Sequence, residues 1–129
     1  MKRGAGILLI NPLHRAALLL LRSRSVAHPG VWSFPGGVQD PGDGTPWLTA
    51  QREFTEETGL RAPRDFAGYH VQRSPGREYY TFICYDPRPN LRRPTLNAEN
   101  DDWKWVRHHE TRSLPLYSRF AAVLARLPY

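Results

Sequence analysis

Two short, uninterrupted apolar runs near the N-terminus place the strongest constraint on the fold. They are AGILLI, residues 5–10, and AALLLLR, residues 16–22. Continuous apolar runs of this length are typical of strands in a sheet that is covered on both faces. The turn residues Asn11 and Pro12 separate the two runs, which predicts two strands joined by a turn.

The same region begins with basic residues, as a secretory signal does. However, Asn11, Pro12, His14 and Arg15 divide the apolar stretch, and no small-residue cleavage site follows. A membrane-spanning helix needs about twenty continuous apolar residues. We therefore expect a cytoplasmic protein with no contact to a membrane.

The basic residues are unusual in kind. Of the 18 lysines and arginines only Lys2 and Lys104 are lysines, and the net charge is +6. Arginine binds phosphate in a bidentate manner, so the bias suits an anionic ligand, although codon usage in a GC-rich genome produces the same bias. Basic residues do not form a continuous block, so we expect no specific nucleic-acid binding.

The remaining pattern predicts an α/β sandwich in a single domain, residues 1–129. Further strands are expected at 31–34, 66–73, 78–85 and 103–106, and a closing helix at 116–127 that Pro128 ends. FPGGVQDPGDGTP, residues 34–46, is expected to be a loop, and residues 86–101 a long one. Cys84, the single cysteine, is expected to be a buried strand residue.

A helix is predicted over residues 46–58. Thr45 is its expected N-cap, Pro46 its first residue and Gly59 its stop. Its buried side is predicted from apolar residues at helical spacing, with Leu48 near the seam: Trp47, Ala50 and Phe54.

Three glutamates lie on one face of this helix. Glu53, Glu56 and Glu57 occupy positions i, i+3 and i+4. Carboxylates this close repel one another unless a cation lies between them, and Mg²⁺ and Mn²⁺ prefer oxygen ligands. Arg52 precedes the set and can reach Glu56. A solvated acidic face is the alternative, and the preceding glycine-rich loop favours the metal site.

GGVQDPGD…REFTEETGL resembles the Nudix box, G-x5-E-x7-R-E-U-x-E-E-x-G-U, in which U is aliphatic. The match covers residues 37–60, and the order of strands extends the resemblance over essentially the whole chain. It implies an α/β/α sandwich with a mixed central sheet. The positions that match are Gly37, Arg52, Glu53, Glu56, Glu57, Gly59 and Leu60.

The chain departs from the box in three places. Asp43 stands where the family has its first glutamate, eight residues instead of seven separate it from Arg52, and Phe54 fills an aliphatic position. The extra residue is expected to be absorbed before the helix begins. Three alternatives are open for Asp43: it stabilises the loop, it contributes remotely to metal binding, or it does neither.

The resemblance implies a hydrolase that cleaves a nucleoside diphosphate linked to another group, by attack of water on phosphorus. It implies Mg²⁺, or Mn²⁺, held by Glu56 and Glu57 with Glu53 as an additional ligand. The carbonyl of Gly36 or Gly37 is a further candidate ligand, and Arg52 is expected to orient the carboxylates.

Many family members use a further glutamate from a late loop. Glu99 resembles that residue in position, with Asp101 and Asp102 as competitors. The general base is left open between Glu53, Glu99 and a metal-held hydroxide.

Substrate-binding candidates follow from the same resemblance. Arg22, Arg24 and Arg77 flank strands that border the cleft in the family and are candidates for phosphate binding. Phe34, Tyr79 and Trp32 are candidates for stacking on a base, and His28 for lining the cleft, although a core role is the commoner one for aromatic residues. Trp103 and Trp105 are expected to pack inward.

A MutT-like nucleoside triphosphate pyrophosphohydrolase is the leading expectation, because the chain is compact. Dinucleoside polyphosphates, ADP-ribose and nucleotide sugars are alternative substrates. A non-catalytic nucleotide-sensing domain is the competing class, and the presence of all three helix glutamates argues against it. The resemblance leaves a homodimer open.

Overall fold

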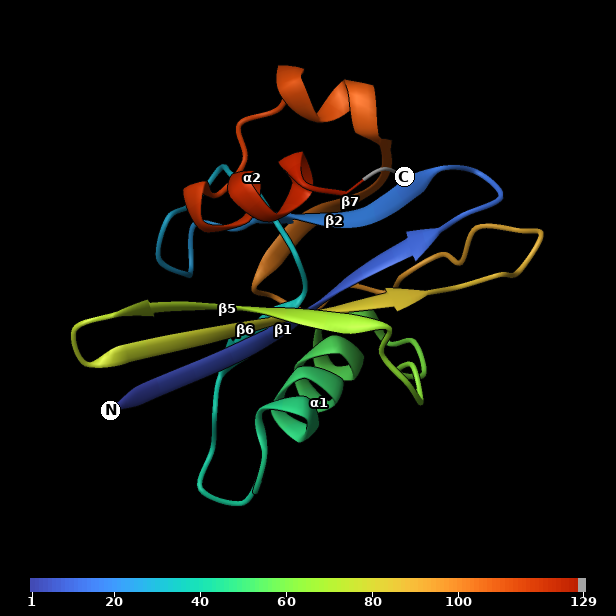
Figure 1. The fold of residues 1–129 in the computed structure, drawn as a ribbon. Coiled ribbons are helices and arrows are strands. Elements are labelled where there is room, and N and C mark those ends of the chain that lie inside the picture. The colour runs from blue at the N-terminus through green and yellow to red at the C-terminus, as the bar shows by residue number, and fades with distance from the viewer. Residues whose placement is uncertain (128–129) are drawn as a thin grey trace.

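A sheet with a helix on each face forms the core of the computed structural model, which describes residues 1–127 (Figure 1). The larger helix, α1 (Pro46–Thr58), covers one face, and α2 (Ser118–Ala125) lies on the other. The strands are β1 (Lys2–Asn11), β2 (Ala16–Arg22), β3 (Trp32–Ser33), β4 (Gly36–Val38), β5 (Gly68–Ser74), β6 (Arg77–Tyr85) and β7 (Asn100–Arg107).

The seven-stranded sheet is mixed, as the family resemblance implies. Its main path is β3-β2-β1-β6-β5, with β4 paired to β1 and β7 paired to β2. β1 and β6 run parallel over the whole of their register from Lys2–Arg77 to Ile10–Tyr85, while the other pairs are antiparallel. The two N-terminal apolar runs are thus central strands, β1 and β2.

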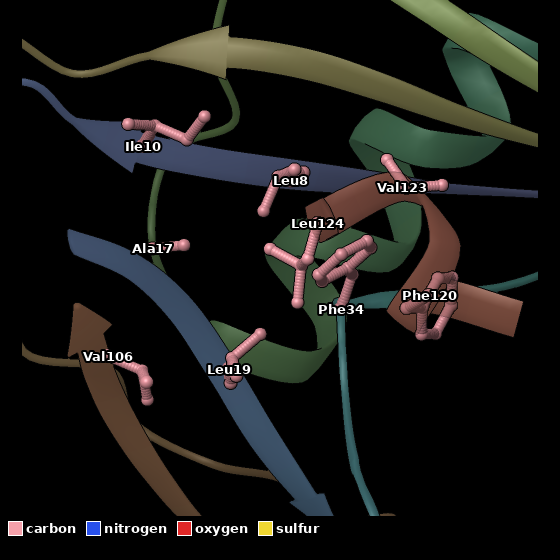
Figure 2. Packing of buried hydrophobic residues seen from close by; sticks show 9 residues of the cluster. All are labelled: Leu8, Ile10, Ala17, Leu19, Phe34, Val106, Phe120, Val123 and Leu124. Carbon is pink, nitrogen blue, oxygen red and sulfur yellow. The ribbon is translucent and has the colours of Figure 1, made fainter. Parts of the chain in front are cut away.

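Side chains that alternate along β1 enter two separate cores. Ile7 and Leu9 pack toward α1, while Leu8 and Ile10 pack toward α2. Figure 2 shows the second of these cores, in which Phe34 and Leu124 lie between Leu8 of β1 and Leu19 of β2. A sheet buried on both faces therefore explains the uninterrupted apolar runs.

β1 and β2 separate soon after they meet. Their pairing is limited to Ile10–Ala17 and Asn11–Ala16, after which β2 continues with β7 and β1 with β6. The two halves of the sheet diverge from this point (Figure 1). Phe34 and α2 fill the space between them, and β4 lies on β1 nearer the open end.

The predicted α1 agrees with the structure at both ends. The Thr45 hydroxyl accepts a hydrogen bond from the Leu48 amide at 3.2 Å, and Gly59 ends the helix at φ 68°. Ala50 and Phe54 are fully buried. Leu48, expected near the seam, is 50% exposed, because it lies on the outer side of the first helical turn.

Several other predicted boundaries differ, most of them by one to three residues. Residues 36–38 were expected in a loop but form β4, because glycines at 36 and 37 permit the close pairing with β1. β7 begins at Asn100 instead of 103, and a 3₁₀ helix, η1 (His108–Ser113), follows it. α2 is shorter than the predicted 116–127, and the expected stop at Pro128 lies outside the described residues.

Trp103 and Trp105 pack against the core beside α1, as predicted, and Cys84 is buried in β6. Within residues 1–127, the structure contains no helix that is both long and apolar enough to span a membrane.

Candidate active site

Glu57 is the most enclosed acid of the predicted set. It is 4% exposed, its Oε2 accepts a hydrogen bond from the Gly36 amide at 2.7 Å, and its Oε1 accepts one from Asn100 Nδ2 at 2.9 Å. Burial, reinforced by the charges of Glu53 and Glu99, raises the pKa of Glu57 to about 8, although the two hydrogen bonds oppose the shift. The carboxyl is thus positioned at both oxygens.

Glu53 lies against the backbone of β4. A side chain at Gly37 would place its Cβ 2.5 Å from the Glu53 carboxyl carbon, so only glycine fits at position 37. Glu53 is 9% exposed, and burial raises its pKa while Arg52, 3.2 Å away, lowers it. β4, the strand missing from the sequence prediction, thus brings its glycine backbone against both buried glutamates.

Glu99 joins these two glutamates from the far end of the long loop. One carboxylate oxygen from each of Glu53, Glu57 and Glu99 lies within 4.8 Å of the others. The backbone around Glu99 is fixed, since its carbonyl accepts from the Ser23 amide at 2.9 Å and the Ala98 carbonyl accepts from the Ser23 hydroxyl at 2.8 Å. Residues 46 positions apart along the chain therefore meet.

Arg52 binds the acids on the outer side of this cluster. Its Nη1 contacts both Glu56 oxygens at 3.1 Å, and its Nε and Nη2 donate to the two Asp43 oxygens at 2.8 and 3.0 Å. Glu56, whose side chain is 51% exposed, is in contact with Arg52 and lies outside the three-carboxylate cluster. Its predicted role as a principal metal ligand is therefore not visible in this arrangement and stays a prediction.

Asp43 has a clear structural task. Besides Arg52, it accepts hydrogen bonds from the Asp40 amide at 2.8 Å and the Thr49 hydroxyl at 2.9 Å. These bonds, chiefly those from Arg52, hold its pKa far below the usual value. Asp43 thus ties the loop before α1 to Arg52, in spite of the extra residue between them.

Tyr79 packs over the glycines of β1 and β4. Its ring and hydroxyl lie where side chains at Gly4, Gly6 and Gly36 would have to be placed. The tyrosine therefore requires glycine at all three positions. Since the Gly36 amide donates to Glu57, this packing also fixes the donor of a catalytic candidate.

A cavity of about 740 Å³ opens beside β4. Arg22, Phe34, Tyr79 and Arg77, all predicted substrate residues, line it, as does His28, whose ring contacts that of Tyr117. Arg24 is exposed and is absent from the described wall. Phe34 and Tyr79 also pack on Phe120, with Phe34 only 3% exposed, so both belong to the core as well as the wall.

Sequence reasoning missed Asn100, Ser23 and Thr49. All three are buried. Asn100 donates to Glu57, Ser23 binds the backbone next to Glu99, and Thr49 of α1 donates to Asp43 in the preceding loop. Such partners have no local signature. A polar residue next to Glu99 was the sole hint for Asn100.

The donor set fits a hard divalent cation. Three carboxylates offer oxygens within 4.8 Å. Two of them are buried, and burial, together with repulsion from neighbouring glutamates, raises the pKa of each buried one. A cation among them would relieve that repulsion and replace the protons.

Comparison with known proteins defines the class. The model of the NUDIX domain matches residues 1–127, so the chain belongs to the Nudix family. A Mycobacterium tuberculosis protein named "Putative 8-oxo-dGTP diphosphatase 3" is 34% identical over 96% of this chain, and the chain spans 60% of that relative's length. A shorter match, 39% identical over 48% of this chain and 29% of the relative, is to a CMP-5′-(N-acetyl-N-hydroxy-3-aminopropyl)phosphonate hydrolase of Streptomyces rubellomurinus.

Solved structures give the same fold. A Nudix hydrolase from M. smegmatis, RenU, has a TM-score of 0.74 at 28% identity and covers 95% of this chain and 81% of its own. The NUDIX domain of Shewanella oneidensis NrtR, complexed with ADP ribose, has a TM-score of 0.76 at 18% identity, and the match covers 95% of this chain and 83% of that one. At that identity the second likeness concerns the fold alone.

Proposed function

We propose that this chain hydrolyses a phosphoanhydride bond of a nucleoside diphosphate linked to another group, with a nucleoside triphosphate as the leading substrate. The observation that carries the proposal is the convergence of Glu53, Glu57 and Glu99 beside the glycine backbone of β4 and a large cavity. The name of the M. tuberculosis relative supports the choice of a nucleoside triphosphate.

The proposed metal ligands are Glu53, Glu57 and Glu56, with the Gly37 carbonyl as a further candidate, and Glu99 lies beside them. Glu56 joins the set when its exposed side chain turns from Arg52 toward the cluster. A bound Mg²⁺ or Mn²⁺ would supply positive charge for the phosphate oxygens and lower the pKa of water. Arg52 would then retain Asp43 as its partner and hold the loop in place.

We assign proton transfer to Glu99. Both Glu57 oxygens already accept hydrogen bonds, and Glu53 is buried beside Arg52, whereas Glu99 is exposed. The Glu99 carboxylate therefore accepts a proton from water as the water oxygen bonds to phosphorus, and the bond from phosphorus to the bridging oxygen breaks.

A hydrolysis screen tests the proposal. Nucleoside triphosphates, dinucleoside polyphosphates, ADP-ribose and nucleotide sugars are incubated with Mg²⁺ or Mn²⁺ and the products are separated by chromatography. We expect nucleoside monophosphate and pyrophosphate from a triphosphate. Binding without cleavage across the whole panel would instead identify a nucleotide-sensing domain.

Glu57→Gln and Glu56→Gln identify the ligands. Because a neutral amide binds a divalent cation more weakly than a carboxylate does, each variant is expected to lose at least about 100-fold in kcat. Glu110→Gln, a change on η1 away from the cluster, is the matched control and is expected to keep its activity. Full activity of Glu57→Gln with Mg²⁺ would contradict the catalytic assignment.

The single free cysteine and the absence of a spanning helix among residues 1–127 suit a cytoplasmic location, which we propose together with a single-domain organisation of residues 1–129. A fractionation experiment with an antibody to the chain tests the location.

A further inference from the structure

The wall of the cavity carries an excess of positive charge. Glu78 is the sole acid among the described residues that line it. The basic residues of the wall are Lys2, Arg3, Arg22, Arg73, Arg77 and Arg119. Arg3 and Arg73 both bind Glu78, at 2.8 and 3.0 Å, so four basic residues remain for which the wall supplies no acid.

Two of the four are held on aromatic rings. The guanidinium carbon of Arg119 lies 4.3 Å from the centre of the Tyr79 ring, and that of Arg22 lies 5.5 Å from the centre of the Tyr117 ring. A guanidinium that lies over an aromatic ring can still donate from its free N–H groups to phosphate oxygens. Arg22 keeps its Nη groups for this, because its Nε donates to the Ala27 carbonyl at 2.7 Å. The guanidinium of Arg119 thus lies over the Tyr79 ring, and the stacking of Tyr79 on a base stays a prediction.

The other two, Lys2 and Arg77, form a pair at the far end. Their Cα atoms are partners across β1 and β6. Arg77 is two residues from Tyr79, so both side chains leave the same face of the sheet. Lys2 lies four positions before Gly6, the partner of Gly36, which places the pair roughly 13 Å from the backbone that holds Glu57.

We propose that this wall binds a second phosphate group of the substrate, one that is remote from the diphosphate being cleaved. Lys2 and Arg77 are its contacts, with Arg119 between them and the acidic cluster. The inference rests on the proposed hydrolysis of a nucleoside diphosphate linked to another group, and within that class it favours substrates that carry a further phosphate over a simple nucleoside triphosphate. The second phosphate is either an ester on the ribose or a distal member of a longer phosphate chain, and the chemistry of recognition is the same.

Binding measurements test this apart from catalysis. AMP, adenosine 3′,5′-bisphosphate and adenosine 5′-tetraphosphate are titrated calorimetrically in buffer with a chelator, so that no hydrolysis interferes. We expect at least one of the two longer probes to bind about tenfold tighter than AMP, since each charge-assisted contact contributes about one decade or more. Tighter binding of the bisphosphate would indicate a site for a phosphate ester on the ribose, and tighter binding of the tetraphosphate a site for the distal phosphate of a longer chain.

Arg77→Ala is the decisive variant, and Arg64→Ala is its matched control. Both remove one positive charge from an exposed arginine, but Arg64 lies outside the wall. We expect the affinity ratio of the preferred probe to AMP to fall toward one in Arg77→Ala and to persist in Arg64→Ala. Equal affinities for all three probes, or an equal loss in both variants, would overturn the proposal.

Hydrolysis measurements distinguish a failure of the proposed function from a failure of the second phosphate site. Coenzyme A and its 3′-dephospho form differ only in a ribose phosphate, and P¹,P⁵-di(adenosine) pentaphosphate and the triphosphate analogue differ only in chain length. A preference of about tenfold in kcat/KM for one phosphate-rich member supports the inference. If no compound is cleaved, the proposed function fails, while the binding ratios still decide the inference.

Discussion

At the scale of single residues, Asn100 determines how Glu57 is presented. Its amide donates to Glu57 Oε1, and the Gly36 amide donates to Oε2, so a hydrogen bond holds each oxygen of the buried carboxyl. The partners of metal ligands typically affect affinity or activity by about 10- to 100-fold. Asn100 is therefore part of the site, because it holds one of the glutamates in place.

We predict that Asn100→Ala lowers kcat by about 10- to 100-fold and raises the Mg²⁺ concentration needed for half-maximal activity. The measurement is a Mg²⁺ titration of the rate. Asn90→Ala, an exposed change in the long loop, is the control and should behave as the unmodified chain does. An unchanged Mg²⁺ requirement in Asn100→Ala would show that the hydrogen bond has no part in ligand placement.

The raised pKa of Glu57, about 8, predicts how pH and metal act together. In the unfolded chain Glu57 ionises near its usual pKa of 4.5, whereas in the folded chain it stays protonated up to a pH of about 8. The free energy of unfolding that this group contributes is therefore fully present at low pH and falls as the pH rises from about 4.5 through 8. A cation replaces the proton and reverses the loss. The increase in Tm caused by Mg²⁺ should therefore be larger at pH 8.5 than at pH 6.

Thermal unfolding at the two pH values, with Mg²⁺ or with a chelator, measures this difference. Glu57→Gln has no proton to exchange and should show a much smaller dependence of the Mg²⁺ effect on pH. A Mg²⁺ effect that is equal at both pH values in the unmodified chain would contradict the assignment.

At the scale of elements, the loop before α1 and the helix itself act as one unit. Thr45 caps the helix, while Asp43 binds the Asp40 amide, Thr49 and Arg52. Asp43 is shorter than the glutamate of the Nudix box, and one extra residue separates it from Arg52. The loop nevertheless brings its backbone close enough for the aspartate to reach Arg52. A glutamate at 43 would add a methylene at a position that is almost fully buried.

We predict that Asp43→Glu lowers the free energy of unfolding by about 1–3 kcal/mol, because a methylene is added where the side chain is 7% exposed. Asp40→Glu, at a carboxylate that is 64% exposed, should change it by less than about 0.5 kcal/mol. Urea denaturation compares the two variants. A more stable Asp43→Glu would mean that the family's glutamate fits this loop after all.

The helix could be predicted from sequence to its last residue because its cap, its first proline and its stop are local signals. β4 could not, because its pairing with β1 depends on glycines at 4, 6, 36 and 37 fitting beneath Tyr79 and beside Glu53, contacts that span the chain. The acidic face of α1 was predictable from spacing, but its burial was not. Glu53 and Glu57 are enclosed by β4 and Asn100, which no helical pattern reveals.

At the scale of the whole molecule, the two cores on either side of the sheet share β1, so local opening of one should disturb the other. Cys84 on β6 is a probe of this coupling, since it is fully buried and burial raises the pKa of its thiol to about 12. A protonated, buried thiol does not react with aromatic disulfides.

We predict that the native chain shows almost no reaction with such a reagent at pH 8, and that guanidinium releases one reactive thiol per chain. The rate of labelling at low denaturant then reports the opening of the central sheet. Fast and complete labelling of the native protein would show that β6 opens without global unfolding.

The early separation of β1 and β2 has a consequence for how such a chain can evolve. The strands meet at two residue pairs, and Phe34 and Phe120, whose ring centres are 4.2 Å apart, pack together in the adjoining core and line the cavity. Neither aromatic belongs to α1 or to the acidic cluster. Selection can therefore change the shape of the cavity by exchanging these two residues while the reactive groups are inherited unchanged.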